Sequence, residues 1–331
     1  MAKIEVTELP GVGPKTAEKL NSAGIMDVDM ILTRSAIELS EITGMDSESA
    51  ANLIKKARNL LKKDLELFRT GDQVMEDRKN IITVSTGCKA FDELLMGGLE
   101  MGASTEIYGQ FGSGKTQFCH TMAVQVINDE RLKQNEQKAR VLWIDTEHTF
   151  RPERIVSIAE AKGYDPNEAI KNIIHTKVTS TTVQQLVIEE AEKMIKDKNI
   201  RLIVVDSTTG LFRSEFLGRG TLSGRQQALN RFLGLIGRFA DHYGIAVIFS
   251  NQVMDDPSVL PGMDPKKPIG GNVMGHASTY RIYLRSFGKS HTALMKDSPH
   301  HPDGEVAFII TNAGISDPEE KKSKKKSDDE L

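Results

Sequence analysis

The 331-residue chain has only two cysteines, Cys88 and Cys119, and a single tryptophan. Two cysteines provide no disulfide framework, so we expect a reducing compartment. No apolar run approaches the roughly 18 residues of a membrane-spanning helix, and the first residues lack the apolar core of a secretory signal. Neither sign of charge dominates, because 43 Lys and Arg face 46 Asp and Glu, for a net charge of -3. Any contact with nucleic acid must therefore come from local basic loops.

The composition is that of a soluble globular protein, with 39% hydrophobic and 27% charged residues. At about 150 residues per domain, the length predicts roughly two domains. Residues 1–65 carry short helical patterns separated by turns, and residues 66–79 form a mostly polar linker. Residues 80–315 follow a different pattern and form the larger domain. Residues 316–331 mix lysines and acids with almost no apolar side chain, which predicts a disordered tail.

Six apolar runs in the larger domain have the length and composition of β-strands. Helical stretches lie between the first four, which predicts a largely parallel α/β sheet. The last strands have no helices between them and predict a β-rich edge. The expected strands are residues 104–108, 141–145, 202–206, 246–250, 281–284 and 306–310.

The run 109–116 matches the phosphate-binding pattern G-x-x-x-x-G-K-[ST] at every defined position. It follows an apolar strand and precedes an amphipathic helix, so backbone N–H groups and the helix dipole can bind phosphate oxygens. We expect Lys115 to reach the β- and γ-phosphates of ATP, and the Thr116 hydroxyl to ligate Mg²⁺. The candidate nucleotide ligands in this run are Gly109, Gln110, Phe111, Gly112, Ser113, Gly114, Lys115 and Thr116.

Two other strands lead into carboxylates. Asp206 ends the strand 202–206 and is the expected acid that contacts Mg²⁺, directly or through water. Glu147 lies just past the strand 141–145, at the sheet edge where α/β proteins bind ligands. It is the candidate for polarising the attacking water. In the alternative interpretation, Asp145 or Glu147 only forms a salt bridge with a nearby arginine.

Gln252 follows the fourth strand and directly precedes a loop rich in Gly and Pro, residues 253–275. A glutamine at this place can sense the γ-phosphate through a hydrogen bond. The arrangement predicts a switch in which the nucleotide state determines the order of the loop.

Together these motifs resemble the archaeal RadA recombinases and their eukaryotic strand-exchange relatives, within the RecA family. The resemblance covers residues from about 9 to 317. Its most specific segments are 109–117 (GQFGSGKTQ), 144–155 (IDTEHTFRPERI), 218–227 (GRGTLSGRQQ), 251–254 (NQVM) and 264–271 with 276–279 (DPKKPIGG and HAST). It implies an α/β fold with a RecA-type P-loop ATPase core, a mostly parallel central sheet and a small all-α helix-hairpin-helix domain at the N-terminus.

The resemblance implies a DNA-dependent ATPase that uses ATP and Mg²⁺, forms helical filaments or rings, and exchanges DNA strands in recombinational repair. Partners would be single- and double-stranded DNA, further copies of the chain and recombination mediators, with no membrane. The compartment would be the cytoplasm or nucleoid of an archaeon, or the nucleus of a eukaryote.

In this family ATP lies between adjacent protomers. The resemblance assigns each of the family's nucleotide-binding positions to a residue of this chain. Lys115, Glu147 and Gln252 match the phosphate, water-activating and sensing positions. The remaining nucleotide matches are Gln117 in the phosphate loop, Arg154 on the adenine, His276 facing the γ-phosphate from the neighbouring protomer, and Asp297 and Pro302 in the neighbour's cap. Asp297 is also a candidate ligand for K⁺.

The first DNA loop of the family matches residues 209–231, which hold four arginines and one acid. Arginines on a loop flanked by glycines suit contacts to phosphates, which fix position without reading sequence. The alternative is a solvated helix face, especially for Arg225 and Arg231. The candidate DNA contacts are Arg213, Arg219 and Arg225 in this loop, Gly270 and Gly271 in the second loop, and Gly11, Gly13 and Lys15 in the N-terminal domain. For these last three, a plain helical turn is the alternative.

The oligomerisation anchor of the family is an aromatic residue followed three positions later by Ala. Here the pair is Phe68 and Gly71. Glycine removes a methyl group from the anchor and loosens the linker. This departure favours a second hypothesis, a recombinase paralogue or mediator that modulates filaments without exchanging strands. A third hypothesis is a RecA-fold ATPase that acts on a protein.

Overall fold

The computed structural model describes residues 4–23, 25, 27–61, 69–216, 218–256 and 265–318, apart from the side chains of Lys196 and Arg219. Outside these residues lie Phe68, the central part (257–264) of the predicted second DNA loop, and the tail from 319 onward. Within the described part, no helix is long and apolar enough to cross a membrane.

A nine-stranded sheet forms the centre of the molecule. The five pairings from β10 through β3, β7, β6 and β4 to β5 are parallel, and β10 to β13 pair antiparallel. The predicted parallel sheet and β-rich edge are therefore confirmed. In sheet order the strands are β13 (Gly314–Ser316), β12 (Glu305–Thr311), β11 (Ser290–Asp297), β10 (Tyr280–Phe287), β3 (Ser104–Gly109), β7 (Ala246–Asn251), β6 (Ile200–Asp206), β4 (Arg140–Asp145) and β5 (Ile173–Lys177).

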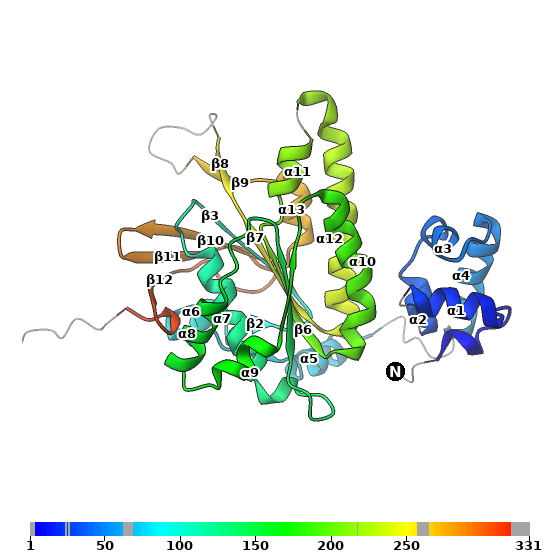
Figure 1. Ribbon diagram of the computed structural model, residues 1–331, viewed down its shortest axis with the longest axis horizontal. Helices are drawn as coiled ribbons and strands as arrows, with labels where there is room; N and C mark the ends of the chain where they lie inside the picture. Colours follow the sequence, from blue (N-terminus) through cyan, green and yellow to red (C-terminus); the bar gives the residue numbers. More distant parts are fainter. Residues whose placement is uncertain are drawn as a thin grey trace, which may run out of the picture.

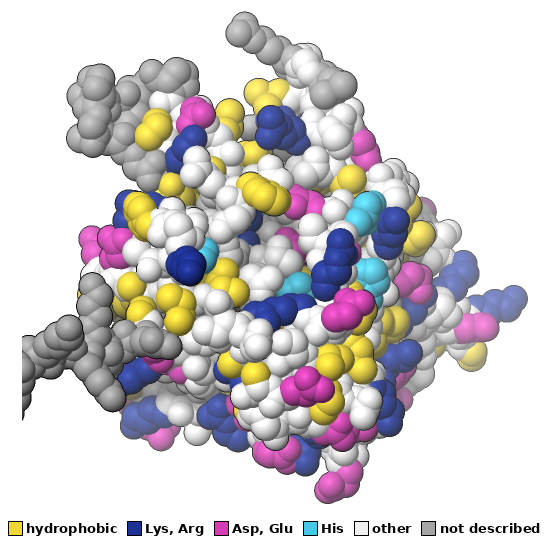
Figure 2. All heavy atoms as spheres, turned by 60° about the vertical axis from the view of Figure 1, so that its left-hand side comes forward, with side chains coloured by type: hydrophobic (Ala, Val, Ile, Leu, Met, Phe, Trp, Pro, Cys, Tyr) yellow, Lys and Arg dark blue, Asp and Glu magenta, His cyan; other side chains and the backbone are white. Residues whose placement is uncertain are grey.

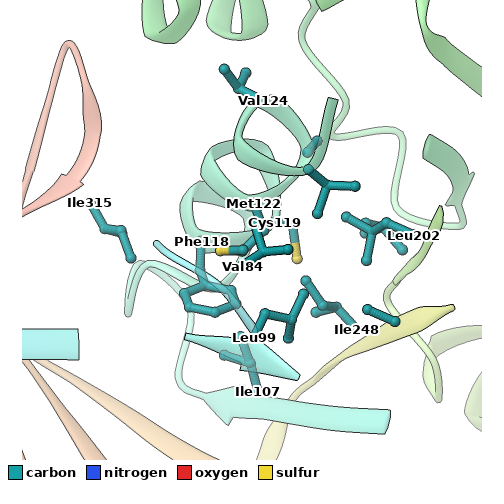
Figure 3. Close-up of a cluster of buried hydrophobic side chains, with 14 of the residues drawn as sticks. Val84, Leu99, Ile107, Phe118, Cys119, Met122, Val124, Leu202, Ile248 and Ile315 are labelled. Carbon is teal, nitrogen blue, oxygen red and sulfur yellow. The ribbon is translucent and has the colours of Figure 1, made fainter. Parts of the chain in front are cut away.

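Helices cover both faces of this sheet (Figure 1). One core contains α7 (Lys115–Asn128) and α8 (Pro152–Ala161), and the other contains α10 (Thr181–Asp197) and α12 (Leu222–Tyr243). Figure 3 shows Phe118, Cys119 and Met122 of α7 packed onto apolar side chains of the sheet. Both cysteines are buried and free. The central strands β3, β7, β6 and β4 are buried on both sides, as expected of a parallel sheet covered on two faces.

Shorter elements connect these layers. Two antiparallel ribbons pair β1 (Thr83–Val84) with β2 (Leu99–Glu100), and β8 (Val253–Asp255) with β9 (Lys266–Pro268). The remaining helices of the larger domain are α6 (Lys89–Leu94), η2 (Glu130–Leu132), α9 (Pro166–Lys171), α11 (Gly210–Glu215), η3 (Arg219–Thr221) and α13 (Gly271–Ala277).

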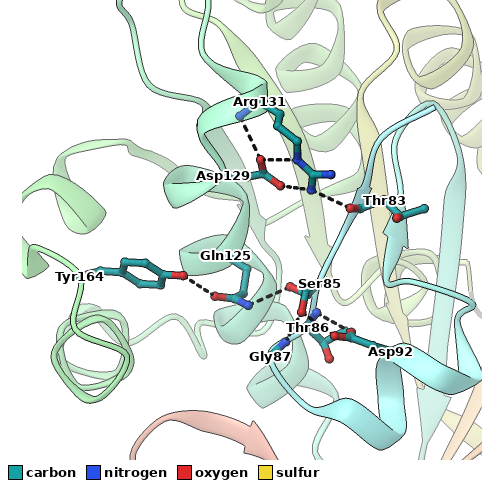
Figure 4. Close-up of polar contacts among 9 residues, drawn as sticks. All are labelled: Thr83, Ser85, Thr86, Gly87, Asp92, Gln125, Asp129, Arg131 and Tyr164. Atoms are coloured by element: carbon teal, nitrogen blue, oxygen red, sulfur yellow. Dashed lines mark hydrogen bonds and ion pairs between the residues drawn. The ribbon is translucent and has the colours of Figure 1, made fainter. Parts of the chain in front are cut away.

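The segment 83–92 is tied to α7 and to the turn that follows it by polar contacts (Figure 4). Arg131 binds the Asp129 carboxylate and donates to the Thr83 carbonyl at 2.9 Å. Gln125 donates to the Ser85 carbonyl at 2.9 Å. These contacts hold the first ribbon of the core against the helix that begins at the phosphate loop.

The N-terminal domain is built from short helices around one apolar core. Pro14 lies in the first turn of its helix, where its missing N–H costs nothing. Ser35 and Glu38 form a capping box, which starts the next predicted helix. The helices are η1 (Val6–Glu8), α1 (Pro14–Ser22), α2 (Val28–Leu32), α3 (Ala36–Thr43) and α4 (Ser47–Leu61).

Two segments differ from their expected character. The polar linker contains a helix, α5 (Gly71–Lys79), whose start is capped by Thr70 and Gln73. Defined structure also continues past the expected start of the tail at 316. Ser316 ends β13, and the Asp317 carboxylate accepts the backbone N–H groups of Lys89 and Ala90, each at 2.8 Å. Asp317 therefore caps α6, where a negative charge is favourable.

The N-terminal domain contacts the larger domain through α10 and α12. Arg34 and Glu192 form an ion pair with side chains only 5% and 7% exposed. Beside this ion pair, the Arg238 guanidinium Nη2 lies 3.4 Å from Glu38 Oε1, and Tyr243 packs on the N-terminal core. A buried charge that loses its partner is destabilising. Arg34 and Glu192 therefore stabilise the contact between the domains only when both are present.

We expect Arg34→Ala to destabilise the docked arrangement by about 3–5 kcal/mol, because it removes the guanidinium that forms a buried ion pair with the Glu192 carboxylate. Thermal unfolding and limited proteolysis between the domains would measure this loss. The exposed Glu76→Gln, which removes an i,i+3 pair with Lys79, serves as control and should cost at most about 0.5 kcal/mol. An Arg34→Ala protein as stable and as protease-resistant as the control would contradict the docking role.

Candidate functional site

A cleft of about 1200 Å³ opens at the carboxyl ends of the central parallel strands. It brings together residues that the sequence predicted from four separate segments. The predicted residues that line it are Gly109, Gln110, Phe111, Gly112, Gly114, Lys115, Thr116, Gln117, Glu147, Arg154, Asp206 and Gln252. Ser113 lies in the same loop with its side chain buried. One chain therefore assembles all the predicted phosphate-loop, magnesium, water-activating and adenine positions.

The phosphate loop connects β3 to α7 through tight backbone turns. Gly114, the residue before α7, has φ 100°, a conformation that favours glycine. At Gly109 a Cβ would lie 2.3 Å from the Leu284 carbonyl oxygen, so only glycine fits there. Lys115 Nζ donates to the carbonyls of Gly109 and Gln110 at 2.9 and 2.8 Å. Burial lowers the pKa of Lys115, although Asp206 and Glu147 lie close enough to oppose that shift.

Asp206 lies at the end of β6 and is almost fully buried. Its Oδ2 accepts hydrogen bonds from Thr116 at 2.8 Å and Thr149 at 3.2 Å, and its Oδ1 accepts from Ser250. Burial raises the pKa of Asp206 in spite of these donors. The Thr116 hydroxyl and the Asp206 carboxylate form an oxygen pair of the kind that Mg²⁺ prefers.

Glu147 lies in the loop after β4 and faces the same cleft. Its Oε1 accepts hydrogen bonds from the Ser207 hydroxyl at 2.6 Å and the Gln252 amide at 2.7 Å. The alternative that Glu147 serves only in a salt bridge has no support among the described ion pairs. The contact with Gln252 joins the candidate water-activating carboxylate to the residue that precedes β8.

Arg154 extends from α8 along the rim of the cleft. Its guanidinium donates to Gln117 at 2.7 Å and to the backbone carbonyls of Thr311 and Asn312 at 2.5 and 3.2 Å. These contacts fix the plane of the guanidinium, and a fixed guanidinium plane can stack on an aromatic base.

Comparison with known proteins agrees with this geometry. The sequence model of the Rad51 family matches residues 77–318, which include the whole sheet and the cleft. The chain belongs to the Rad51 family. A model described as a SAM-like helix-hairpin-helix tandem matches residues 3–59. The chain is also 45% identical over 321 residues to a protein of Cenarchaeum symbiosum (strain A) named "DNA repair and recombination protein RadA"; the match covers 96% of this chain and 80% of that protein.

Three residues predicted for this Rad51-family cleft do not line it. His276 lies near the end of α13, Asp297 ends β11, and Pro302 follows it, and all three side chains are exposed. A single protomer thus brings together the phosphate-loop half of the predicted site. The positions assigned to a neighbouring protomer point to solvent.

The described parts of the two predicted DNA loops, which are α11, the start of α12 and the β8–β9 ribbon, lie at the same end of the molecule, at the top of Figure 1. Arg213 is exposed on α11, and Arg225 is partly exposed in the first turns of α12. The side chain of Arg219 lies outside the described residues. In the view of Figure 2, Lys and Arg side chains are spread over the visible face, with Asp and Glu side chains among them.

Arg231 lies in a different setting. Its guanidinium is 3.9 Å from both Glu41 and Glu189, at the contact with the N-terminal domain. For this residue the structure therefore favours the solvated helix face over a DNA contact.

Three of the four glycines assigned to DNA have a positive φ, which favours glycine. Gly270 has φ 96° and directly precedes α13, and Gly271 is the first residue of that helix. Gly11 has φ 94°, and a Cβ there would lie 2.4 Å from Lys56 Nζ. Gly13 precedes α1, and Lys15 lies in the first turn of the same helix. Lys56 is a basic neighbour of this hairpin that the sequence analysis did not identify.

The structure also adds Asn251 to the candidate functional residues. Its amide donates to Glu106 at 2.6 Å and to the Ile269 carbonyl at 2.7 Å, and it accepts from the Thr209 hydroxyl at 2.7 Å. Thr209 begins the first predicted DNA loop and Ile269 lies in the second, so one buried side chain links both loops to the sheet. The sequence signal for Asn251 is its place as a polar residue at the end of an apolar strand. The sequence analysis assigned a role to the neighbouring Gln252 instead.

Gly71 lies in the first turn of α5, and a Cβ built there meets nothing within 4 Å. An alanine would therefore fit in the isolated chain. The space around this position therefore does not require glycine.

Proposed function

We propose that this Rad51-family chain is a DNA recombinase that couples ATP hydrolysis to filament formation on single-stranded DNA and to strand exchange in repair. The observation that carries the proposal is one cleft in which Lys115, the Thr116–Asp206 pair and the Glu147–Gln252 pair converge. Gln252 directly precedes β8, which leads into the second DNA loop. The identity to a protein named for DNA repair and recombination supports the same function.

The residues of the cleft have separate roles in hydrolysis. The phosphate loop binds the β- and γ-phosphates through its backbone N–H groups and Lys115. Glu147 orients a water for attack on the γ-phosphorus and accepts its proton, while ADP leaves. Ser207 and Gln252 hold the Glu147 carboxylate in place by hydrogen bonds. Gln252 can then transmit the presence of the γ-phosphate to the β8–β9 ribbon.

The donor set fits magnesium bound together with nucleotide. Within the described residues, no group of three or more His, Cys, Asp or Glu side chains could hold a metal alone. Mg²⁺ commonly takes one or two protein oxygens together with phosphate oxygens and waters, and Thr116 with Asp206 supplies such oxygens. Mg²⁺ held there would neutralise charge on the β- and γ-phosphates.

The same proposal assigns His276, Asp297 and Pro302 to the cleft of a neighbouring protomer. Their exposure on one chain supports a site completed by assembly. Asp297 is then the candidate ligand for K⁺, and Phe68 with Gly71 is the candidate anchor between protomers. ATP bound between protomers would stabilise the filament, and hydrolysis would release it.

We expect Arg213→Ala to weaken binding to single-stranded DNA of every sequence, because the exposed guanidinium contacts phosphates. The slope of log affinity against log salt should become shallower by roughly 0.7 for one lost phosphate contact. Fluorescence anisotropy at several salt concentrations measures both effects. Lys289→Ala, which removes an exposed charge between β10 and β11, serves as control. A loss restricted to certain sequences would contradict the phosphate-contact role.

Strand exchange between homologous DNA molecules tests the proposal against the paralogue hypothesis. A recombinase forms long helical filaments with ATP and single-stranded DNA, seen by electron microscopy, and yields joint molecules only with homologous partners. ATP hydrolysis without long filaments or joint molecules would favour a mediator. Absence of DNA binding at low salt would favour an ATPase that acts on a protein.

A further inference from the structure

The loop that carries Glu147 is anchored outside the nucleotide cleft by a second polar pair. We propose that Asp145 and His175 are positioning residues that hold this loop so that Glu147 meets the attacking water. The inference rests on the proposed ATP hydrolysis. Neither residue belongs to the described lining of the cleft.

Asp145 is the last residue of β4 and is only 3% exposed. Its two carboxylate oxygens accept the backbone N–H groups of Thr149 at 3.1 Å and Phe150 at 3.2 Å. The chain therefore folds back on itself four to five residues after the strand, with Glu147 in the middle of the closed turn. The turn includes His148 at φ 59°, a conformation uncommon for residues other than glycine.

His175 comes from β5, the neighbouring strand, and completes this anchor. Its Nε2 lies 3.2 Å from Asp145 Oδ2, and its ring stacks on Phe150 with centroids 4.8 Å apart. Burial tends to raise the pKa of Asp145, but the hydrogen bonds from His175, Phe150 and Thr149 outweigh it, so the pKa is lowered. The carboxylate stays ionised, which is the form that accepts two N–H groups and the imidazole.

Two contacts connect the anchored turn to the candidate chemistry. The Thr149 hydroxyl donates to Asp206 at 3.2 Å, beside the expected magnesium position. Glu147 accepts from Ser207 at 2.6 Å and Gln252 at 2.7 Å. A displacement of about 1 Å in a reacting group can cost about 100-fold in rate. Loosening the turn should therefore reduce turnover, while nucleotide binding by the phosphate loop remains.

The variants Asp145→Asn and His175→Ala test this inference. We expect kcat for DNA-stimulated ATP hydrolysis to fall about 10- to 100-fold, with the Kd for a fluorescent ATP analogue changed by less than about threefold. His175→Gln, which retains a side-chain N–H near the position of Nε2, should recover most of the rate. Lys177→Ala, an exposed change on the same strand, serves as control. Equal loss in the glutamine and alanine variants would overturn the role of the His175 hydrogen bond.

A double-mutant cycle distinguishes positioning of Glu147 from general damage. In a Glu147→Gln background the residual rate no longer depends on the carboxylate, so Asp145→Asn should lower it by less than about threefold. A full 10- to 100-fold further loss would show that Asp145 acts through something other than Glu147 and would overturn the proposal.

Trp143 provides a readout that needs no hydrolysis. It is the only tryptophan, is fully buried, and its ring centroid lies 5.1 Å from that of Phe150. We expect His175→Ala and Asp145→Asn, but not Lys177→Ala, to change Trp143 emission and raise its quenching by acrylamide. A wild-type protein that hydrolyses no ATP would contradict the proposed function. Unchanged Trp143 signals in both variants would overturn the anchoring itself.

Discussion

Replacing Lys115 with alanine is expected to lower kcat/KM for ATP by about 10²–10³-fold, the loss typical of removing one strong donor from developing charge. Lys115 is the cation at the centre of the phosphate loop. In its described hydrogen bonds, the Lys115 Nζ donates only to backbone carbonyls of this loop. In the alanine variant, those carbonyls cannot supply the positive charge that Lys115 places beside the γ-phosphate. Steady-state hydrolysis with single-stranded DNA present measures the effect.

The matched control for Lys115 is Lys133→Ala, which removes a lysine on the surface of the same domain that pairs with Glu130. It should hydrolyse ATP at the wild-type rate. Lys115→Ala should also fail to form the ATP-dependent filaments. If Lys115→Ala hydrolysed ATP and assembled as the wild type does, the cleft would be the wrong site.

Glu147→Gln should lower kcat by about 10²–10⁴-fold, the range associated with loss of a general base. The glutamine side chain has the size of glutamate and keeps an oxygen that can accept the hydrogen bond from Ser207, so the turn should stay folded. It cannot take a proton from water. Nucleotide affinity and filament assembly should persist, which separates this variant from Lys115→Ala.

Single-turnover hydrolysis and nucleotide binding, measured side by side, test the role of Glu147. Glu153→Gln, an exposed change in the first turn of α8, serves as control and should leave both unchanged. A Glu147→Gln protein with near wild-type kcat would assign water activation to another group. Loss of nucleotide binding together with kcat would point to a structural role.

Much of the fold follows from local sequence, because buried parallel strands are continuous apolar runs and the phosphate loop has a fixed pattern. Three strands of the main sheet were missed for physical reasons. β13 has only three residues, too few to show an alternating pattern. β5 lies at the sheet edge and is half exposed, so it carries only two strongly apolar residues, Ile173 and Ile174. In β11 the buried side of the alternation consists of His291, Ala293 and Met295, which is weakly hydrophobic. The five-residue α2 is too short to show a helical period.

The candidate site divides in the same way. Lys115, Thr116 and Asp206 could be found because each lies at a fixed place in a motif or at the end of an apolar strand. Asn251 and His175 act through residues distant in sequence, so the residues beside them do not show what their side chains contact. The contact of Arg34 with Glu192 joins positions 158 residues apart and depends on how two domains dock. Such pairs appear only when the tertiary structure is known.

The central claim is that one cleft hydrolyses ATP in response to DNA bound by the neighbouring loops. Its most direct test is the rate of ATP hydrolysis by the wild-type protein at low salt, with and without single-stranded DNA. The proposed function predicts hydrolysis that rises with single-stranded DNA and saturates, and that is about 10²–10³-fold weaker in Lys115→Ala. The same rate with and without DNA would contradict it.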